Sequence, residues 1–88
     1  MPVVIMSASL SKPYAEWKEA FDAGESLRRA AGMEVIYVGH PLEDAQTARI
    51  VQRVASMEAM AQFVKDNAHL IKESGVVPDS IEVVPCTD

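Results

Sequence analysis

Strand-like and helix-like segments alternate along this chain in an order that few small folds accommodate. Apolar runs rich in β-branched residues are typical of strands, and the chain has four, at residues 3–10, 34–40, 47–55 and 80–85. Helix-like segments occupy residues 11–32 and 56–75. The order is therefore β-α-β-β-α-β. Because each strand-helix-strand unit takes a right-handed crossover, this order predicts an α+β domain with one four-stranded antiparallel sheet and two helices on one face.

The predicted helix ends rest on residues that commonly begin or end helices. Ser11 and Ser56 are each placed to accept a backbone N–H bond at a helix start. Gly32 and Gly75 suit the left-handed conformation that ends many helices. Gly24 is expected to loosen or bend the middle of the first helix.

The strand segments are apolar on both faces, and two helices cannot hide both. In the first strand, alternation places Val3 and Ile5 on one side and Val4 and Met6 on the other. The uncovered side should then present an apolar patch of the kind that marks an interaction site. A second copy packed sheet to sheet about a twofold axis would cover it, so we expect a homodimer. The alternative is a monomer with an open apolar sheet.

The chain length and the net charge exclude several classes of function. The 88 residues make a single domain over 1–88, and the net charge of −5 repels phosphate backbones and anionic lipid. Neither nucleic acid nor a membrane is therefore expected as a partner. The apolar N-terminal stretch is too short for a signal peptide or a membrane span, which indicates a cytoplasmic protein. The single cysteine, Cys86, permits no intramolecular disulfide.

Several motifs on these elements resemble those of a known superfamily. They are Lys12-Pro13-Tyr14-x-x-Trp17-x-x-x-Phe21-Asp22, Ala31-Gly32, Gly39-His40-x-x-x-Asp44 and Asn67-x-x-x-Ile71-x-x-Ser74-Gly75-Val76. Together with the element order, they resemble the dimeric α/β-barrel superfamily, which has the ferredoxin-like fold. Within it the chain is most similar to a small bacterial family of uncharacterised function. The resemblance implies a dimer whose two sheets close into a barrel.

The resemblance also sets the expected function. Relatives include cofactor-free monooxygenases, isomerases and heme-degrading enzymes, so the fold does not select a reaction. No heme-ligand pattern matches, and no cofactor is expected. We expect a small apolar organic ligand between sheet and helices, with cofactor-independent oxygenation or isomerisation as the reaction class. The alternative is a non-catalytic binding or assembly module. A pocket of at least about 300 Å³ reaching His40 or Tyr37 would favour the first, and a filled core the second.

Aromatic residues on the first helix are the candidate apolar wall of a ligand site. Tyr14, Trp17 and Phe21 share one stripe of that helix, where a core role comes first. The functional alternative is that Trp17 and Phe21 line a gap between helices and sheet. Arg28 falls in the same stripe. We expect Gly24 to rotate Arg28 into solvent; otherwise it is a buried cation that needs an anion.

Basic and aromatic residues on the strands complete the candidate ligand site, which includes Tyr37. Arg49 and Arg53 lie four residues apart on one strand, so both share a face. We expect an ion pair with Glu or Asp first, and a ligand carboxylate second. The sequence does not determine which face of the sheet carries Arg49 and Arg53, because a slip of one residue in the hairpin register exchanges the two faces.

The two histidines are weak candidates for chemistry. His40 follows the second strand at a turn, where it is either exposed to solvent or a proton-handling group at a pocket rim. His69 is expected to face water. No Cys, Asp or Glu accompanies either at ligand spacing, so no metal site is expected.

Overall fold

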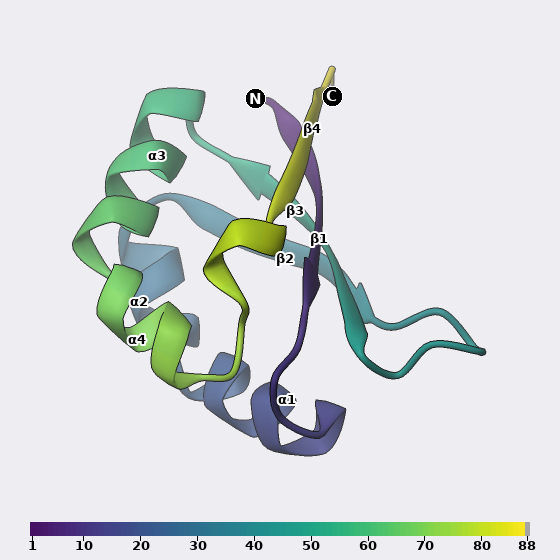
Figure 1. Cartoon of the computed structure of the whole chain (residues 1–88). Helices are drawn as coiled ribbons and strands as arrows, with labels where there is room; N and C mark the ends of the chain where they lie inside the picture. Colours follow the sequence, from purple (N-terminus) through teal and green to yellow (C-terminus); the bar gives the residue numbers. More distant parts are fainter. Residues whose placement is uncertain (88) are drawn as a thin grey trace.

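The computed structural model describes residues 1–87, and its elements follow the expected order (Figure 1). Over these residues one antiparallel sheet has the strand order β2-β3-β1-β4. Its strands are β1 (Val3–Ser9), β2 (Met33–Gly39), β3 (Thr47–Val54) and β4 (Glu82–Cys86). The helices are α1 (Tyr14–Ala23), α2 (Glu25–Ala30), α3 (Met57–Asp66) and α4 (Ala68–Glu73), and a 3-10 turn, η1 (Pro78–Ser80), precedes β4. The helices cover one side of the sheet, which confirms the ferredoxin-like α+β class.

Each expected helix is divided into two shorter ones. Gly24, with φ −90° and ψ 7°, separates α1 from α2. Asn67, with φ −114° and ψ 17°, separates α3 from α4, and its side-chain Nδ2 donates to the carbonyl of Phe63 at 2.9 Å. The expected weakness at Gly24 is confirmed, whereas the division at Asn67 was not predicted. The two divisions let each helix pair curve along the sheet.

The helix starts are partly as predicted. Ser56 caps α3 by accepting the N–H of Ala59 at 3.0 Å. The prediction for Ser11 is wrong, because α1 begins after Pro13 without a side-chain cap and the Ser11 hydroxyl instead donates to the carbonyl of Gly75 at 3.1 Å. Ser11 thus ties the end of the second helix pair to the start of the first.

A β-bulge changes which side chains of β2 face the helices. The pairing of β2 with β3 shifts between Val35 and Tyr37, so Ile36 is the extra residue. Val35 and Val38 therefore face the helices together, and Tyr37 faces away. Strict alternation along β2 would place Val35 and Tyr37 on one face, and the bulge interrupts that alternation.

The buried core under the helices forms two clusters rather than one. Val4, Met33, Val54 and Met60 form the first. The second consists of Leu10, Trp17, Ala48 and Val76. The first lies under α3, and the second beneath α1 and the chain that follows α4. The space between two such clusters is where a cavity can form.

The helix-free face carries one apolar row across all four strands. Pairing places Tyr37 beside Val51, Val51 beside Ile5, and Ile5 beside Val84. Tyr37, Ile5 and Val84 are 52, 40 and 55% exposed. We call these four residues the apolar row. The expected uncovered apolar patch is confirmed for this row.

Charged side chains flank the apolar row on both sides. One flank has Glu34 paired with Arg53 at 3.0 Å, and the other has Arg49 and Glu82 on either side of Ser7. The helix-free face is therefore apolar in the middle and polar towards both strand ends. Among the helices of residues 1–87, none is long and apolar enough to cross a bilayer.

Asp44 fastens the loop between β2 and β3, which projects from the body of the molecule (Figure 1). Its carboxylate accepts from the Thr47 hydroxyl at 2.6 Å and from the Gln46 N–H at 3.0 Å. These two hydrogen bonds lower the pKa of Asp44. Because the pKa of Asp44 is lowered, the stability that its ionised carboxylate gives the loop is fully present above the ordinary carboxyl pKa. This stability is lost as the pH falls through the lowered pKa.

Thr47→Val should therefore raise the pKa of Asp44 towards its ordinary value, because the stronger of the two hydrogen bonds is removed. The pKa is measured by following the Asp44 carboxyl carbon in an NMR titration. Replacing the exposed Thr87 by Val is the matched control and should leave the Asp44 titration in place. An unchanged midpoint in Thr47→Val would contradict the assignment.

Candidate functional site

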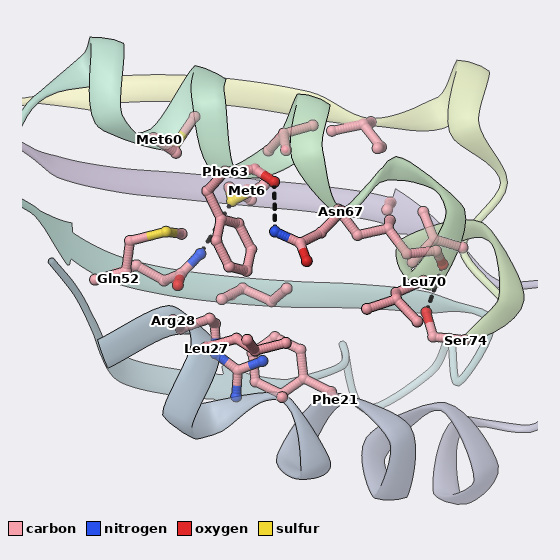
Figure 2. Close-up of a pocket in the computed structure, with 18 of the residues that line it drawn as sticks. Met6, Phe21, Leu27, Arg28, Gln52, Met60, Phe63, Asn67, Leu70 and Ser74 are labelled. Atoms are coloured by element: carbon pink, nitrogen blue, oxygen red, sulfur yellow. Dashed lines mark hydrogen bonds between the residues drawn. The ribbon is translucent and has the colours of Figure 1, made fainter. Parts of the chain in front are cut away.

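A cleft of about 380 Å³ separates the two helix pairs above the sheet. Figure 2 shows it with α3 and α4 on one side, α1 and α2 on the other, and strands as the floor. Its walls are almost wholly apolar, and Leu27 and Leu70, each about half exposed, lie on opposite helix pairs. The cleft exceeds the minimum size expected for small-molecule sites.

Aromatic residues of α1 form one wall of the cleft. Trp17 is 1% exposed, and its ring centroid lies 5.0 Å from that of Phe21 and 5.6 Å from that of Tyr14. Trp17 and Phe21 line the cleft and also belong to or contact the core. Their core role is thus observed, and the structure brings both to the gap between helices and sheet.

Arg28 is the only arginine or lysine that lines the cleft within residues 1–87. It is 7% exposed, so the prediction that Gly24 turns it into solvent is wrong. Its guanidinium carbon lies 3.8 Å from the centroid of the Phe21 ring, which holds the group by a cation–π contact. Arg28 lies seven residues after Phe21, so helical spacing places both on one stripe, and the division at Gly24 does not turn Arg28 away from it.

The electrostatic surroundings of Arg28 leave its charge incompletely offset. Its Nε is buried and has no hydrogen-bond partner. Burial lowers the pKa of Arg28, while Glu25 and then Asp22 act in the opposite direction with smaller effect. Those two carboxylates are engaged elsewhere, Glu25 with Arg29 at 3.2 Å and Asp22 with Lys18 at 2.7 Å. Arg28 remains a cation held among apolar side chains.

Gln52 is a second buried polar group at the cleft, and the sequence interpretation missed it. It is 2% exposed, its Nε2 donates to the Met6 sulfur at 3.3 Å, and its Oε1 has no hydrogen-bond partner. The signal was available: alternation along β3 places Gln52 on the same side as the buried Ala48 and Val54. A polar residue among inward-facing apolar ones is informative because burial of an unpaired amide is unfavourable.

The strand residues predicted for the ligand site lie elsewhere. Tyr37, Arg49 and Arg53 are all on the helix-free face, which settles the face that the sequence left open. The preferred ion pair is confirmed for Arg53, which contacts Glu34. The Tyr37 ring lies over Gly39, where an added Cβ would meet the Tyr37 side chain at 2.8 Å or less. The sheet separates these three side chains from the cleft.

His40 lies outside the lining of the cleft. Its ring packs edge-on against Tyr14 at 4.6 Å, and its Nδ1 lies 2.7 Å from the Pro41 carbonyl oxygen. Because a carbonyl only accepts, Nδ1 is the donor in this contact. His40 reaches the cleft residue Trp17 only through Tyr14, and its proton-handling role stays a prediction.

Neither histidine belongs to a metal site in the described part of the chain. His69 faces solvent, as predicted, and contacts Glu73 at 2.9 Å. No group of three or more His, Cys, Asp or Glu within residues 1–87 is placed to hold a metal ion.

Comparison with family models identifies the chain. No curated protein matches it in sequence. A model described as a domain of unknown function, DUF3764, matches residues 1–87. The chain belongs to this family. The expected kinship with a small family of uncharacterised function is therefore confirmed.

Solved structures of the same fold cover nearly the whole DUF3764 chain. SnoaB, a cofactor-independent oxygenase from Streptomyces nogalater, is 9% identical, with a TM-score of 0.73 over 99% of this chain and 91% of its own. Two provisionally named antibiotic biosynthesis monooxygenases are each 15% identical. The one from Bordetella bronchiseptica has a TM-score of 0.75 over 99% and 96% of the two chains. The one from Nitrosomonas europaea has 0.70 over 100% and 98%. Identities this low show a shared fold.

Arg28→Met should not destabilise the protein and should raise its free energy of unfolding by about 1 kcal/mol. A methionine of similar volume keeps the packing and removes the desolvation cost of a buried cation that lacks an ion pair, and this gain exceeds the lost cation–π contact. Chemical denaturation followed by circular dichroism measures the change. Arg29→Met, on the exposed side of α2, is the matched control and should change little. A loss of more than about 2 kcal/mol in Arg28→Met would show that the arginine is structural.

Proposed function

We propose that this DUF3764 protein binds one small, mostly apolar organic molecule in the cleft between its helix pairs. The observation that carries the proposal is the cleft itself, which remains open between two core clusters and has aromatic side chains on its wall. A filled core would have favoured a purely structural module; the cleft has the expected size, although its lining includes neither His40 nor Tyr37. Cofactor-independent oxygenation or isomerisation is the reaction class that we propose for the bound molecule, supported by the activity named for SnoaB, a cofactor-independent oxygenase of the same fold.

The proposed assembly is a homodimer formed through the helix-free face. The apolar row gives each copy a band of exposed side chains across all four strands, and charged residues border it. A twofold axis would pack one row on the other and bring the flanking acids and bases of the two copies together. The cleft opens on the opposite side of the sheet, so such a dimer leaves both clefts accessible. A cytoplasmic location remains part of this proposal.

Closing the cleft should abolish ligand binding without unfolding the protein. Ala20 lines the cleft on α1 and is exposed, so Ala20→Phe adds a ring to the cleft. The probe is 2-naphthol, and the readout is the indole N–H signal of Trp17, the single tryptophan of the chain, in a nitrogen-15 NMR titration. We expect a saturable shift in the native protein and none in Ala20→Phe.

Ala15→Phe provides the matched control for this experiment, because Ala15 is exposed on the same helix and does not line the cleft. It should bind the probe as the native protein does. Equal binding by Ala20→Phe and Ala15→Phe, or no binding by the native chain, would overturn the cleft as the ligand site.

Ile5→Lys should convert the dimer into a monomer. Ile5 is the central-strand member of the apolar row, and a lysine there would place two ammonium groups in the proposed interface. Val77→Lys changes an equally apolar exposed residue outside the row and should leave the dimer intact. Native mass spectrometry at micromolar concentration measures the subunit number. A native chain that has the mass of one copy would contradict the proposed assembly.

A further inference from the structure

Two residues in the lining of one otherwise apolar cleft each have a buried polar atom without a hydrogen-bond partner. Nε of Arg28 is a donor and Oε1 of Gln52 is an acceptor. Leaving such groups unpaired lowers stability, so folded proteins rarely retain two in one place without a use. Figure 2 shows both side chains on the same end of the cleft, with Met60 and Phe63 beside them.

Arg28 is suited to a carboxylate. The Phe21 ring covers one face of the guanidinium, which leaves its edge of N–H donors for a planar anion. Residues 1–87 offer Arg28 no ion pair within 4 Å, because the nearby Asp22 and Glu25 contact Lys18 and Arg29. Glycine at position 24 leaves room for this side chain, because a Cβ there would lie 3.1 Å from Nη1 of Arg28.

Gln52 is suited to a hydroxyl donor. Its Nε2 faces the Met6 sulfur, which accepts a hydrogen bond and cannot donate one. This contact fixes the orientation of the amide and leaves Oε1 as the unsatisfied acceptor. A ligand that completes the site must therefore bring both an anionic acceptor and an O–H donor on an apolar body.

We infer that the ligand is a hydroxylated apolar carboxylic acid, whose carboxylate binds Arg28 and whose hydroxyl donates to Oε1 of Gln52. The inference rests on the proposed function of the cleft and names the class of molecule that the cleft takes. The rings of Trp17, Phe21 and Phe63 in the lining favour an aromatic body. An aliphatic hydroxy acid shares the same polar chemistry, and the test separates the two.

The test measures the affinity of the full chain for four probes by calorimetry, with the Trp17 indole signal reporting the site. The probes are 4-hydroxy-2-naphthoate, 2-naphthoate, 2-naphthol and 10-hydroxydecanoate. In 4-hydroxy-2-naphthoate the hydroxyl is too far from its own carboxylate to donate to it. We expect 4-hydroxy-2-naphthoate to bind about tenfold or more tightly than 2-naphthol, and several-fold more tightly than 2-naphthoate, since a charged hydrogen bond contributes more than a neutral one. If 10-hydroxydecanoate binds more tightly than the naphthoates, the acid site is supported and the ligand is an aliphatic hydroxy acid.

Two variants test whether Arg28 binds the ligand carboxylate and Gln52 the ligand hydroxyl. Arg28→Met should weaken the two naphthoates about tenfold or more while 2-naphthol changes less than about twofold. Gln52→Leu should remove the advantage of 4-hydroxy-2-naphthoate over 2-naphthoate. Arg29→Met is the control and should alter neither ratio. Arg28→Lys, which keeps the charge without the planar fork, should restore part of the preference, and it serves if Arg28→Met fails to fold.

The outcomes separate this inference from the proposed function. If 2-naphthol binds as tightly as 4-hydroxy-2-naphthoate, or if Arg28→Met leaves their ratio unchanged, the acid site is wrong while the cleft remains a ligand site. If no probe moves the Trp17 signal, both the acid site and the proposed function are overturned.

Discussion

The structure depends on one geometric constraint: a four-stranded sheet has two faces, and its helices lie on only one. On the covered face, the helix pairs bury two separate apolar clusters and leave a cleft between them. On the other face, a row of apolar side chains stays exposed across every strand. The first face gives the protein its proposed ligand site, and the second its proposed partner.

The two helix divisions connect this constraint to chemistry. The division at Gly24 leaves Arg28 on the stripe of Phe21, where its guanidinium stacks on the ring. The division at Asn67 separates α3 from α4, which form the opposite wall of the cleft. A buried arginine without an ion pair costs stability, and the structure retains it beside an equally unsatisfied glutamine. A loss of folding stability at a concave site is characteristic of a site that binds or transforms a ligand.

Most of the fold could be predicted from the sequence because its signals are local. The strand runs, the cap at Ser56 and the left-handed glycines depend on neighbouring residues alone, and they were read correctly. The bulge at Ile36 could not be predicted, because it depends on how β2 pairs with β3. The prediction for Arg28 was wrong because it expected Gly24 to turn the second half of the helix, whereas Arg28 keeps the position that the spacing of an unbroken helix gives it. Arg49 was included in the ligand site because strand alternation gives two faces without saying which one the helices cover.

The central claim is that the cleft holds a molecule that completes Arg28 and Gln52. A crystal structure grown with 4-hydroxy-2-naphthoate tests it most directly. The account expects the naphthalene rings beside Phe21, with a carboxylate oxygen within hydrogen-bond reach of the Arg28 guanidinium. A cleft that contains only ordered water, with the acid bound elsewhere or not at all, would contradict it.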